Sequence, residues 1–399
     1  MNGKVIDLKG RTVFAGFCDT CLDFLSWAEG QERLNLSSVR SAQEFSDSLS
    51  TYAQANPKPL RGWYIAYGLP EQLIISRDDL DAAVPALPCA VIDSMNSHAV
   101  LNTPAMSEFN MPQDNVELDE FSQHIPDLSK EDILYLVKTY SPKLNAQGIT
   151  EIWTNFYGDA KNLWDLFFNR AYEALSFRLR CNFSFDDVLS MNEFLATGLR
   201  TGDGLPFCKF GGIVVEESLK QDDQKNMITS AHLSGCQIIG SSNQYCLNAL
   251  ERVIKRFRKT PRHLISGTNF TSKHIDRMRL LGLGGIVLAE NEDSALHEAF
   301  QNGLVISAGS GDYLVPPVKR ISTLVSHGLS VAEALSVCTW SASWNAGNEQ
   351  RRGELALGND ADIVVLEQDP FLVRPEEIAG IDVAMTICAG KIVYDSGTL

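Results

Sequence analysis

A regular alternation of short apolar runs with amphipathic segments is the feature that most constrains the fold of this chain. Each run is short, continuous and rich in β-branched or aromatic residues, which is typical of strands buried on both faces. Helical patterns lie between several runs; Ser242 to Lys259, for example, carries apolar residues at helical spacing and is followed by Pro261. Strands that alternate with helices predict parallel βα units, and eight candidate strands fit a (β/α)8 barrel, with a doubly wound open sheet as the alternative. The runs are Thr12–Phe17, Ile149–Phe156, Phe177–Phe183, Phe207–Val215, Cys236–Ile239, His263–Ile265, Gly285–Leu288 and Leu304–Ser307.

The last 50 residues have a different pattern, of short strands joined by tight turns. Ala361–Leu366, Ala384–Cys388 and Lys391–Tyr394 predict a small antiparallel sheet, with which Lys4–Leu8 can pair. We therefore expect residues 1–14 and 350–399 to form a small, truncated β-sandwich domain. Residues 15–349 are expected to form the barrel, with an insertion around residues 60–128.

The composition argues against several classes of function. The 399 residues include 50 acidic and 34 basic side chains, a formal net charge of −16, whereas nucleic-acid binding and docking on an anionic membrane both need a basic face. No stretch approaches the roughly 18 consecutive apolar residues of a membrane span, and we see no charged-then-apolar leader at the start. The nine scattered cysteines predict reduced thiols in a cytoplasmic protein. Neither a GxGxxG motif after a strand nor a GxxxxGK[ST] loop is present, which disfavours nucleotide binding.

Longer motifs occur at both ends of the chain. Gly353–Pro370 reads G-E-L-A-L-G-N-D-A-D-I-V-V-L-E-Q-D-P, and Met385–Tyr394 follows it as a closing hairpin. Val5–Phe17 leads into the first expected barrel strand, and Asn96–Met106 contains an S-H-A triplet. In these segments the chain resembles the amidohydrolase superfamily, and most of all the large amidohydrolases that include N-substituted formamide deformylases. The resemblance implies a (β/α)8 barrel and hydrolysis of a C–N bond in a small amide, formamide or cyclic amide.

The resemblance also implies one or two divalent metals, such as zinc, at the carboxyl end of the barrel, where the metal lowers the pKa of a bound water. Its usual ligands are a His-x-His pair, a lysine, two further histidines and an aspartate. All four histidines are replaced here, and a glycine supplies no side-chain donor. We therefore predict an altered or absent metal site. The corresponding positions read Cys21 and Asp23, Lys209, Gly240 or Ser241, Gly267, and Asp312.

Four residues remain as catalytic candidates and as weak metal-ligand candidates: Cys21, Asp23, Lys209 and Asp312. Cys21 and Asp23 share one face at the expected end of a strand. They form either an unusual thiolate–carboxylate site or the remnant of a dead metal site. If Cys21, Lys209 and an acid converge, the set resembles the Cys-Lys-Glu arrangement of metal-free amide hydrolases, in which a nearby cation activates the thiol.

Three further residues are candidates for substrate binding. His98 and Asn96 lie in the S-H-A segment, and His98 either orients a substrate carbonyl or bonds to its own loop. Trp63 either lines a substrate cavity or packs in a core. Glu216 and Glu217 are interpreted as solvated loop acids, and the sequence indicates a role near the barrel mouth only weakly.

The sequence predicts an amidohydrolase-like protein that acts on a C–N bond of a small molecule, with an altered or absent metal site. A catalytically inactive pseudoenzyme that binds a small molecule or a partner subunit is the main alternative, and a metal-free lyase or isomerase is another. Members of the family carry more strands before the segment that corresponds to Val5–Leu8. An unpaired sheet edge is therefore expected, covered in a homodimer or by another chain.

Overall fold

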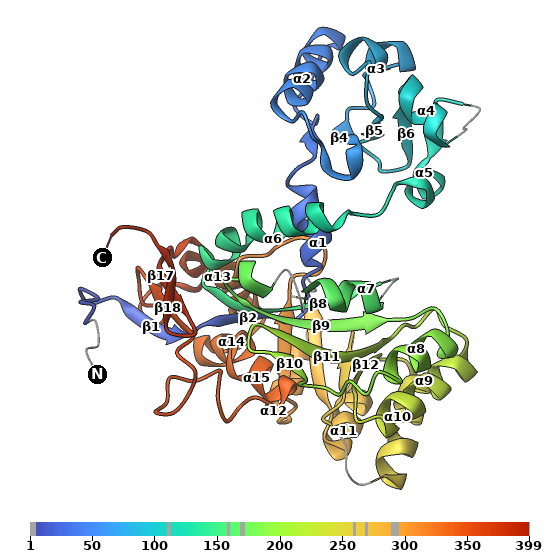
Figure 1. The fold of residues 1–399 in the computed structure, drawn as a ribbon. Helices are drawn as coiled ribbons and strands as arrows, with labels where there is room; N and C mark the ends of the chain where they lie inside the picture. Colours follow the sequence, from blue (N-terminus) through green and yellow to red (C-terminus); the bar gives the residue numbers. More distant parts are fainter. Residues whose placement is uncertain are drawn as a thin grey trace. The chain divides into compact units, whose positions relative to one another are not determined.

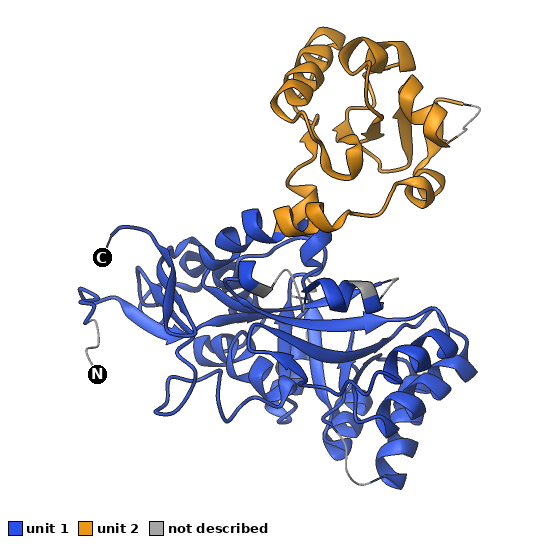
Figure 2. Cartoon of the chain, viewed as in Figure 1, with its two compact units in different colours: residues 1–27, 137–399 blue, residues 28–136 orange. Residues whose placement is uncertain are grey.

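The computed structural model describes residues 5–109, 113–157, 160–167, 172–257, 261–267, 270–288 and 295–398. The chain divides into two compact units (Figure 2). The first contains Met1–Trp27 and Val137–Leu399, and the second contains the residues between them, Ala28–Leu136. Among the described residues, no helix combines the length and the apolar character that crossing a membrane requires.

A sheet of eight parallel strands forms the centre of the first unit (Figure 1). The two end strands meet through a parallel bridge between Leu22 and Gly311, and the Asp23 amide donates to the Gly311 carbonyl at 3.1 Å. The predicted (β/α)8 barrel is therefore confirmed, and the doubly wound open sheet is wrong. The strands, in spatial order, are β15 (Ile306–Gly309), β14 (Gly284–Leu288), β13 (Leu264–Ser266), β12 (Gln237–Ser241), β11 (Cys208–Val215), β9 (Arg178–Ser184), β8 (Ile149–Phe156) and β2 (Phe17–Asp19); the short β10 (Gly204–Leu205) pairs with β11.

The helices of this unit start and stop where local chemistry predicts. The Asn243 side chain caps α10 by accepting from the Cys246 amide, and Gly282 ends α11 in the left-handed region, with φ of 68°. Ser330 and Glu333 form a capping box at the start of α14. The helices are α1 (Phe24–Gly30), α6 (Lys130–Asn145), α7 (Ala160–Leu166), α8 (Val188–Leu195), α9 (Gln221–Leu233), α10 (Gln244–Arg256), α11 (Ser272–Leu281), α12 (Ala295–Gln301), α13 (Pro317–Ser326), α14 (Val331–Val337) and α15 (Trp340–Ala346), with 3-10 turns η3 (Tyr172–Ala174) and η4 (Pro375–Gly380).

The run Thr12–Phe17 is divided between two sheets rather than forming one barrel strand. Its first part is β1 (Thr12–Ala15), which pairs antiparallel with β16 (Ile363–Leu366), followed in the same sheet by β17 (Val383–Cys388) and β18 (Lys391–Asp395). The division falls at Gly16, where an added Cβ would lie 2.2 Å from the Thr150 hydroxyl oxygen, so only glycine fits. The small antiparallel sheet thus uses Thr12–Ala15 as its N-terminal strand. Of the segment Lys4–Leu8, which the sequence suggested, Val5–Leu8 forms no strand and Lys4 lies outside the described residues.

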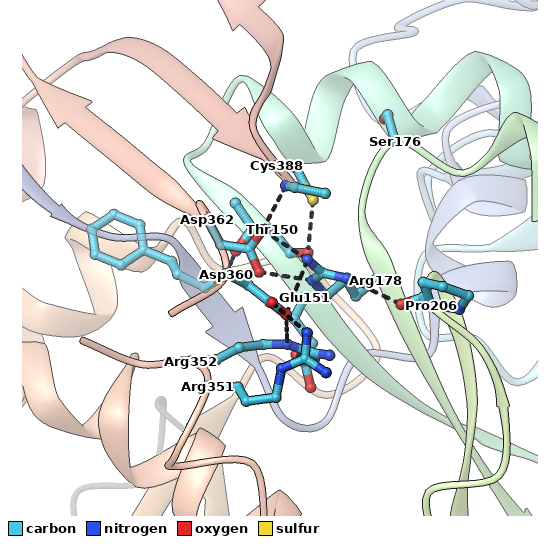
Figure 3. A network of polar contacts seen from close by, with 12 residues as sticks. Thr150, Glu151, Ser176, Arg178, Pro206, Arg351, Arg352, Asp360, Asp362 and Cys388 are labelled. Atoms are coloured by element: carbon cyan, nitrogen blue, oxygen red, sulfur yellow. Dashed lines mark hydrogen bonds and ion pairs between the residues drawn. The ribbon is translucent and has the colours of Figure 1, made fainter. Parts of the chain in front are cut away.

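Buried charges connect the barrel to the loop that precedes β16 (Figure 3). Arg178 at the start of β9 donates to both carboxylate oxygens of Asp362, at 2.7 and 3.2 Å, and only 7% and 8% of these two side chains is exposed. Arg352 donates to Glu151 of β8 at 2.7 Å and to Asp360 at 3.0 Å. Because every charge has a partner of opposite sign, the amino end of the barrel can bury them together.

The second unit is a five-stranded sheet with a hydrophobic core on each face (Figure 1). Strands β3 to β5 are parallel, while β6 and β7 run antiparallel. The unit starts well before the expected insertion around residues 60–128, because Phe45 and Leu49 of α2 pack against β4 and β5. Its elements are β3 (Leu34–Asn35), α2 (Ala42–Ala55), η1 (Leu60–Gly62), β4 (Tyr64–Leu69), α3 (Arg77–Ala83), β5 (Cys89–Asp93), β6 (His98–Leu101), α4 (Thr103–Phe109), β7 (Asn115–Glu117) and α5 (Leu118–His124).

Two histidines of the first unit form a buried pair outside the barrel. The ring nitrogens His232 Nδ1 and His263 Nε2 are 2.9 Å apart, and the Ile238 amide donates to His263 Nδ1 at 3.1 Å. The rings are 3% and 1% exposed. Burial, together with the neighbouring His232, lowers the pKa of His263 to about 3, so the ring is neutral in the folded protein.

We predict a stability component that disappears in acid. Because the folded-state pKa of His263 lies below its ordinary value of about 6.5, its contribution is complete above pH 6.5 and falls as the pH drops towards 3. The slope is about 1.4 kcal/mol of unfolding free energy per pH unit. Urea denaturation between pH 7.5 and pH 4.5 measures it. His263→Gln should flatten this part of the profile, whereas His98→Gln at an exposed ring should not; equal profiles for wild type and His263→Gln would contradict the prediction.

Candidate active site at the barrel mouth

Polar side chains follow several strands at the carboxyl end of the barrel, the end at which barrel proteins of this type carry their sites. Cys21 and Asp23 follow β2, Tyr157 follows β8, and Glu216 follows β11. Asp312 follows β15 and is exposed. The negative charges of Asp312, Asp23 and Glu216 all raise the pKa of the Cys21 thiol.

A buried ion pair connects the first and last barrel strands beside this mouth. Asp19 is fully buried and accepts from the Ser310 amide at 2.9 Å and from the Ser310 hydroxyl at 2.5 Å. The guanidinium of Arg320 on α13, itself fully buried, lies 3.1 Å from the same carboxylate and donates to the Ala308 carbonyl at 3.0 Å. The loops that carry Cys21 and Asp312 are therefore held at their bases.

Cys21 is a protonated thiol in this setting. Burial, and then the charges of Asp19, Asp312, Asp23 and Glu216, raise its pKa to about 12. A thiolate nucleophile needs the opposite environment, with a nearby cation. The structure thus provides no activation for the sequence-based hypothesis that Cys21 is a nucleophile.

Asp23 caps the helix that follows it. The Ser26 amide donates to its Oδ1 at 3.0 Å, and the Ser26 hydroxyl donates to its Oδ2 at 2.7 Å. An aspartate that precedes the first turn of a helix commonly satisfies free backbone amides in this way. Both oxygens of Asp23 are therefore engaged by α1.

Lys209 lies at the other end of the barrel. It is the second residue of β11, pairs in register with Arg180 near the start of β9, and donates to the Gly204 carbonyl at 2.8 Å. Burial, followed by the charge of Arg352, lowers its pKa. Because β11 continues to Val215 before it reaches the mouth, the structure does not bring Lys209 together with Cys21, Asp23 and Asp312, as the sequence suggested.

The residues at the implied metal positions do not fit a histidine-bound metal. An added Cβ at Gly240 would lie 2.2 Å from Cys246 Sγ of α10, so it would point into the helix layer, and Ser241 is the residue of this pair on the side of the barrel interior. An added Cβ at Gly267 would lie 2.8 Å from the Ser242 hydroxyl oxygen. Throughout the described residues, no group of three or more histidine, cysteine, aspartate or glutamate side chains is arranged to hold a metal ion.

Glu216, a weak sequence candidate for the barrel mouth, lies there near Tyr157, which the sequence did not single out. The Ser184 hydroxyl donates to Glu216 Oε1 at 3.4 Å. Partial burial, and then the charges of Glu216, Cys21 and Asp23, raise the pKa of Tyr157 to about 12, so its hydroxyl keeps the proton. The sequence signal for Tyr157 and Glu216 is their position, because each residue directly follows a predicted strand.

The three predicted substrate-binding residues lie in the second unit and have local roles there. Asn96 turns the chain between β5 and β6 with φ of 53°. His98 starts β6 with a half-exposed ring, and its Nδ1 is 3.0 Å from the Ser97 hydroxyl and 3.8 Å from Asp93 Oδ2. Trp63 is 3% exposed and stacks on Phe109, with ring centroids 4.6 Å apart.

Comparison with known proteins supports the resemblance at the C-terminal end. Residues 319–394 match the sequence model of the Amidohydrolase family, Amidohydro_3. A segment of 70 residues is 36% identical to the amidohydrolase-like protein YtcJ of Bacillus subtilis, and it spans 18% of this chain and 13% of that protein.

Solved structures share the fold over nearly the whole chain. A metal-dependent hydrolase of uncharacterised activity from Pyrococcus horikoshii has a TM-score of 0.76 at 15% identity, covering 94% of this chain and 90% of that one. An adenosine deaminase from Xanthomonas campestris with bound zinc has a TM-score of 0.56 at 11% identity, covering 96% and 80%. At these identities the likeness shows the fold, which is the barrel of amidohydrolase-type proteins.

We predict that the position of Gly240, where β12 packs against α10, does not accept a side chain. Gly240→Ala should destabilise the protein by about 1–3 kcal/mol through overpacking, because its Cβ would meet Cys246 Sγ. Cys246→Ala introduced with it should recover part of this loss. Gly380→Ala is the matched control, since nothing lies within 4 Å of its added Cβ. Thermal or urea denaturation measures the effect, and a Gly240→Ala variant as stable as the control would contradict the prediction.

Proposed function

We propose that this protein is an amidohydrolase-superfamily hydrolase that cleaves a C–N bond of a small amide, formamide or cyclic amide at the barrel mouth without a histidine-bound metal. The barrel fold and the family match at residues 319–394 support the reaction class. The observation that supports the metal-free part is the Tyr157–Glu216 pair at the mouth, together with the lack, among the described residues, of any group of three or more histidine, cysteine, aspartate or glutamate side chains arranged to hold a metal ion.

In this proposal Glu216 is the general base. Its carboxylate takes a proton from a water molecule, the water oxygen bonds to the substrate carbonyl carbon, and the proton passes to the leaving nitrogen as the C–N bond breaks. The products are a carboxylic acid and an amine. Tyr157 is a positioning residue, because its hydroxyl proton holds the Glu216 carboxylate in one orientation.

A specific observation favours a second candidate, a pseudoenzyme that keeps the pocket without the chemistry. The Cys21 thiol is protonated and Asp23 is engaged as a helix cap, so two residues at strand ends have structural rather than reactive environments. In that case the mouth binds a small molecule, and the Tyr157–Glu216 pair contributes only polarity.

One experiment separates the readings. Protein purified without added metal is analysed for zinc, iron, manganese and nickel, and is assayed against N-substituted formamides, linear amides and cyclic amides. Turnover that persists after chelation supports the metal-free hydrolase. Stoichiometric metal that is required for turnover overturns the metal-free part, and binding of substrates without turnover supports the pseudoenzyme.

We predict that Glu216→Gln lowers kcat/KM on any substrate found by about 10²–10⁴-fold, the usual contribution of a general base. Glu217→Gln is the matched control, because Glu217 is the next residue and is exposed. Tyr157→Phe should cause a smaller loss and should change the pH dependence of kcat/KM, since it leaves Glu216 in place but without its donor. Equal activity of Glu216→Gln and Glu217→Gln would rule out this role.

Two expectations about the surroundings of the protein also stand as proposals. We propose a cytoplasmic protein, consistent with nine cysteines that are all unpaired, most of them buried. We also propose a homodimer, or a complex with another chain, that covers an edge strand of the small sheet, β1 or β18. Light scattering at several concentrations tests the second, and a monomer throughout would contradict it.

A further inference from the structure

The charged side chains of the barrel are distributed unequally between its two ends. At the amino end the arginines lie in ion pairs, Arg178 with Asp362 and Arg352 with Glu151. At the carboxyl end, the loops that follow the barrel strands carry several acids and one base among their described residues, so the mouth has an excess of negative charge. The acids are Asp23, Asp186, Asp187, Glu216, Glu217 and Asp312, and the base is Lys220.

Asp312 is an exposed acid on a fixed piece of backbone. Its carboxylate takes part in no hydrogen bond or ion pair with another described residue. The two residues before it are held in place, because Ser310 donates from its amide to the buried Asp19 at 2.9 Å and Gly311 accepts from the Asp23 amide at 3.1 Å. A carboxylate that is unpaired, but whose backbone is fixed, suits a charge-assisted hydrogen bond from a ligand cation.

Two tyrosines expose ring faces at the same end of the barrel. Tyr157 directly follows β8 and is 58% exposed, and Tyr313 lies in the loop after β15 and is 77% exposed. Such a face attracts an ammonium or guanidinium group within about 6 Å of the ring centroid. The raised pKa of Tyr157, due to partial burial and then to the charges of Glu216, Cys21 and Asp23, agrees with an acidic setting, since a neighbouring cation would lower it.

We propose that the barrel mouth selects substrates that carry a positive charge, such as an ammonium group, a few bonds from the scissile amide, and that Asp312 determines this selectivity. The cationic group binds the Asp312 carboxylate while the amide lies at Glu216. The inference rests on the function proposed above for the place of cleavage, and it adds the substrate class. An acidic mouth also attracts cationic molecules from a distance, an effect that salt screens.

Three amides of matched length test the proposal: 5-aminopentanamide is cationic, hexanamide is neutral and adipamate is anionic. Isothermal titration of the Glu216→Gln variant measures their binding apart from turnover. 5-Aminopentanamide should bind at least tenfold more tightly than hexanamide, and adipamate should bind more weakly than either. Raising the salt concentration from about 50 mM to about 500 mM should reduce the preference for the cationic amide.

A second substitution in the same background tests the role of Asp312. Asp312→Asn should reduce the preference for 5-aminopentanamide over hexanamide to less than threefold and leave hexanamide binding unchanged. Asp382→Asn is the matched control, because Asp382 is an exposed acid that precedes β17 of the small sheet, and it should leave the preference unchanged.

Three outcomes would overturn the inference: no binding of 5-aminopentanamide, equal or tighter binding of hexanamide or adipamate, or a preference that Asp312→Asn and Asp382→Asn alter equally. Assaying the wild-type protein with the same amides distinguishes this inference from the proposed function. A cationic preference in titration without turnover contradicts the hydrolase and leaves the charge selectivity standing. Turnover of hexanamide without any preference for the cationic amide supports the hydrolase and overturns the selectivity.

Discussion

The buried ion pair between Arg178 and Asp362, together with the ion pairs beside it, joins the barrel of the first unit to the small antiparallel sheet. Arg178 begins a barrel strand, Asp362 precedes the strand β16 that pairs with β1, and Arg352 joins Asp360 to Glu151 of the next barrel strand (Figure 3). Removing one partner from such a set leaves an uncompensated buried charge, which costs about 3–5 kcal/mol. The amino end of the barrel and the small sheet therefore form a common polar base, and the carboxyl end is left to carry the site.

At the carboxyl end the constraint is steric as well as chemical. The positions that the family resemblance assigns to histidines read Cys21, Asp23, Gly240 or Ser241, and Gly267, and an added Cβ at Gly267 would lie 2.8 Å from the Ser242 hydroxyl oxygen. The acids at the mouth keep Cys21 protonated, and Asp23 serves α1. Tyr157 and Glu216 remain at the ends of β8 and β11, where the charge of Glu216 acts on the Tyr157 hydroxyl, and we propose proton transfer as their chemistry.

Strand positions could be predicted well, because buried parallel strands must be continuous apolar runs and the helices between them carry their own caps. The role of a residue within a run could not. The apolar pattern alone does not show that Thr12–Phe17 is cut at Gly16, which follows from the approach of Thr150. The apolar pattern also does not show how far β11 extends. Because β11 runs from Cys208 to Val215, Lys209 lies at the amino end of the strand. The same limit applies to Trp63, whose stacking on Phe109 depends on a helix more than forty residues away.

By itself, the sequence determined the barrel and the C-terminal sheet, since periodicity and residue identity are local properties of the chain. Tertiary structure alone decided which groups meet, as His232 meets His263 and Arg178 meets Asp362. Protonation state and unsatisfied hydrogen-bonding capacity depend on neighbours brought from distant positions, and these are the properties that determine chemistry and binding.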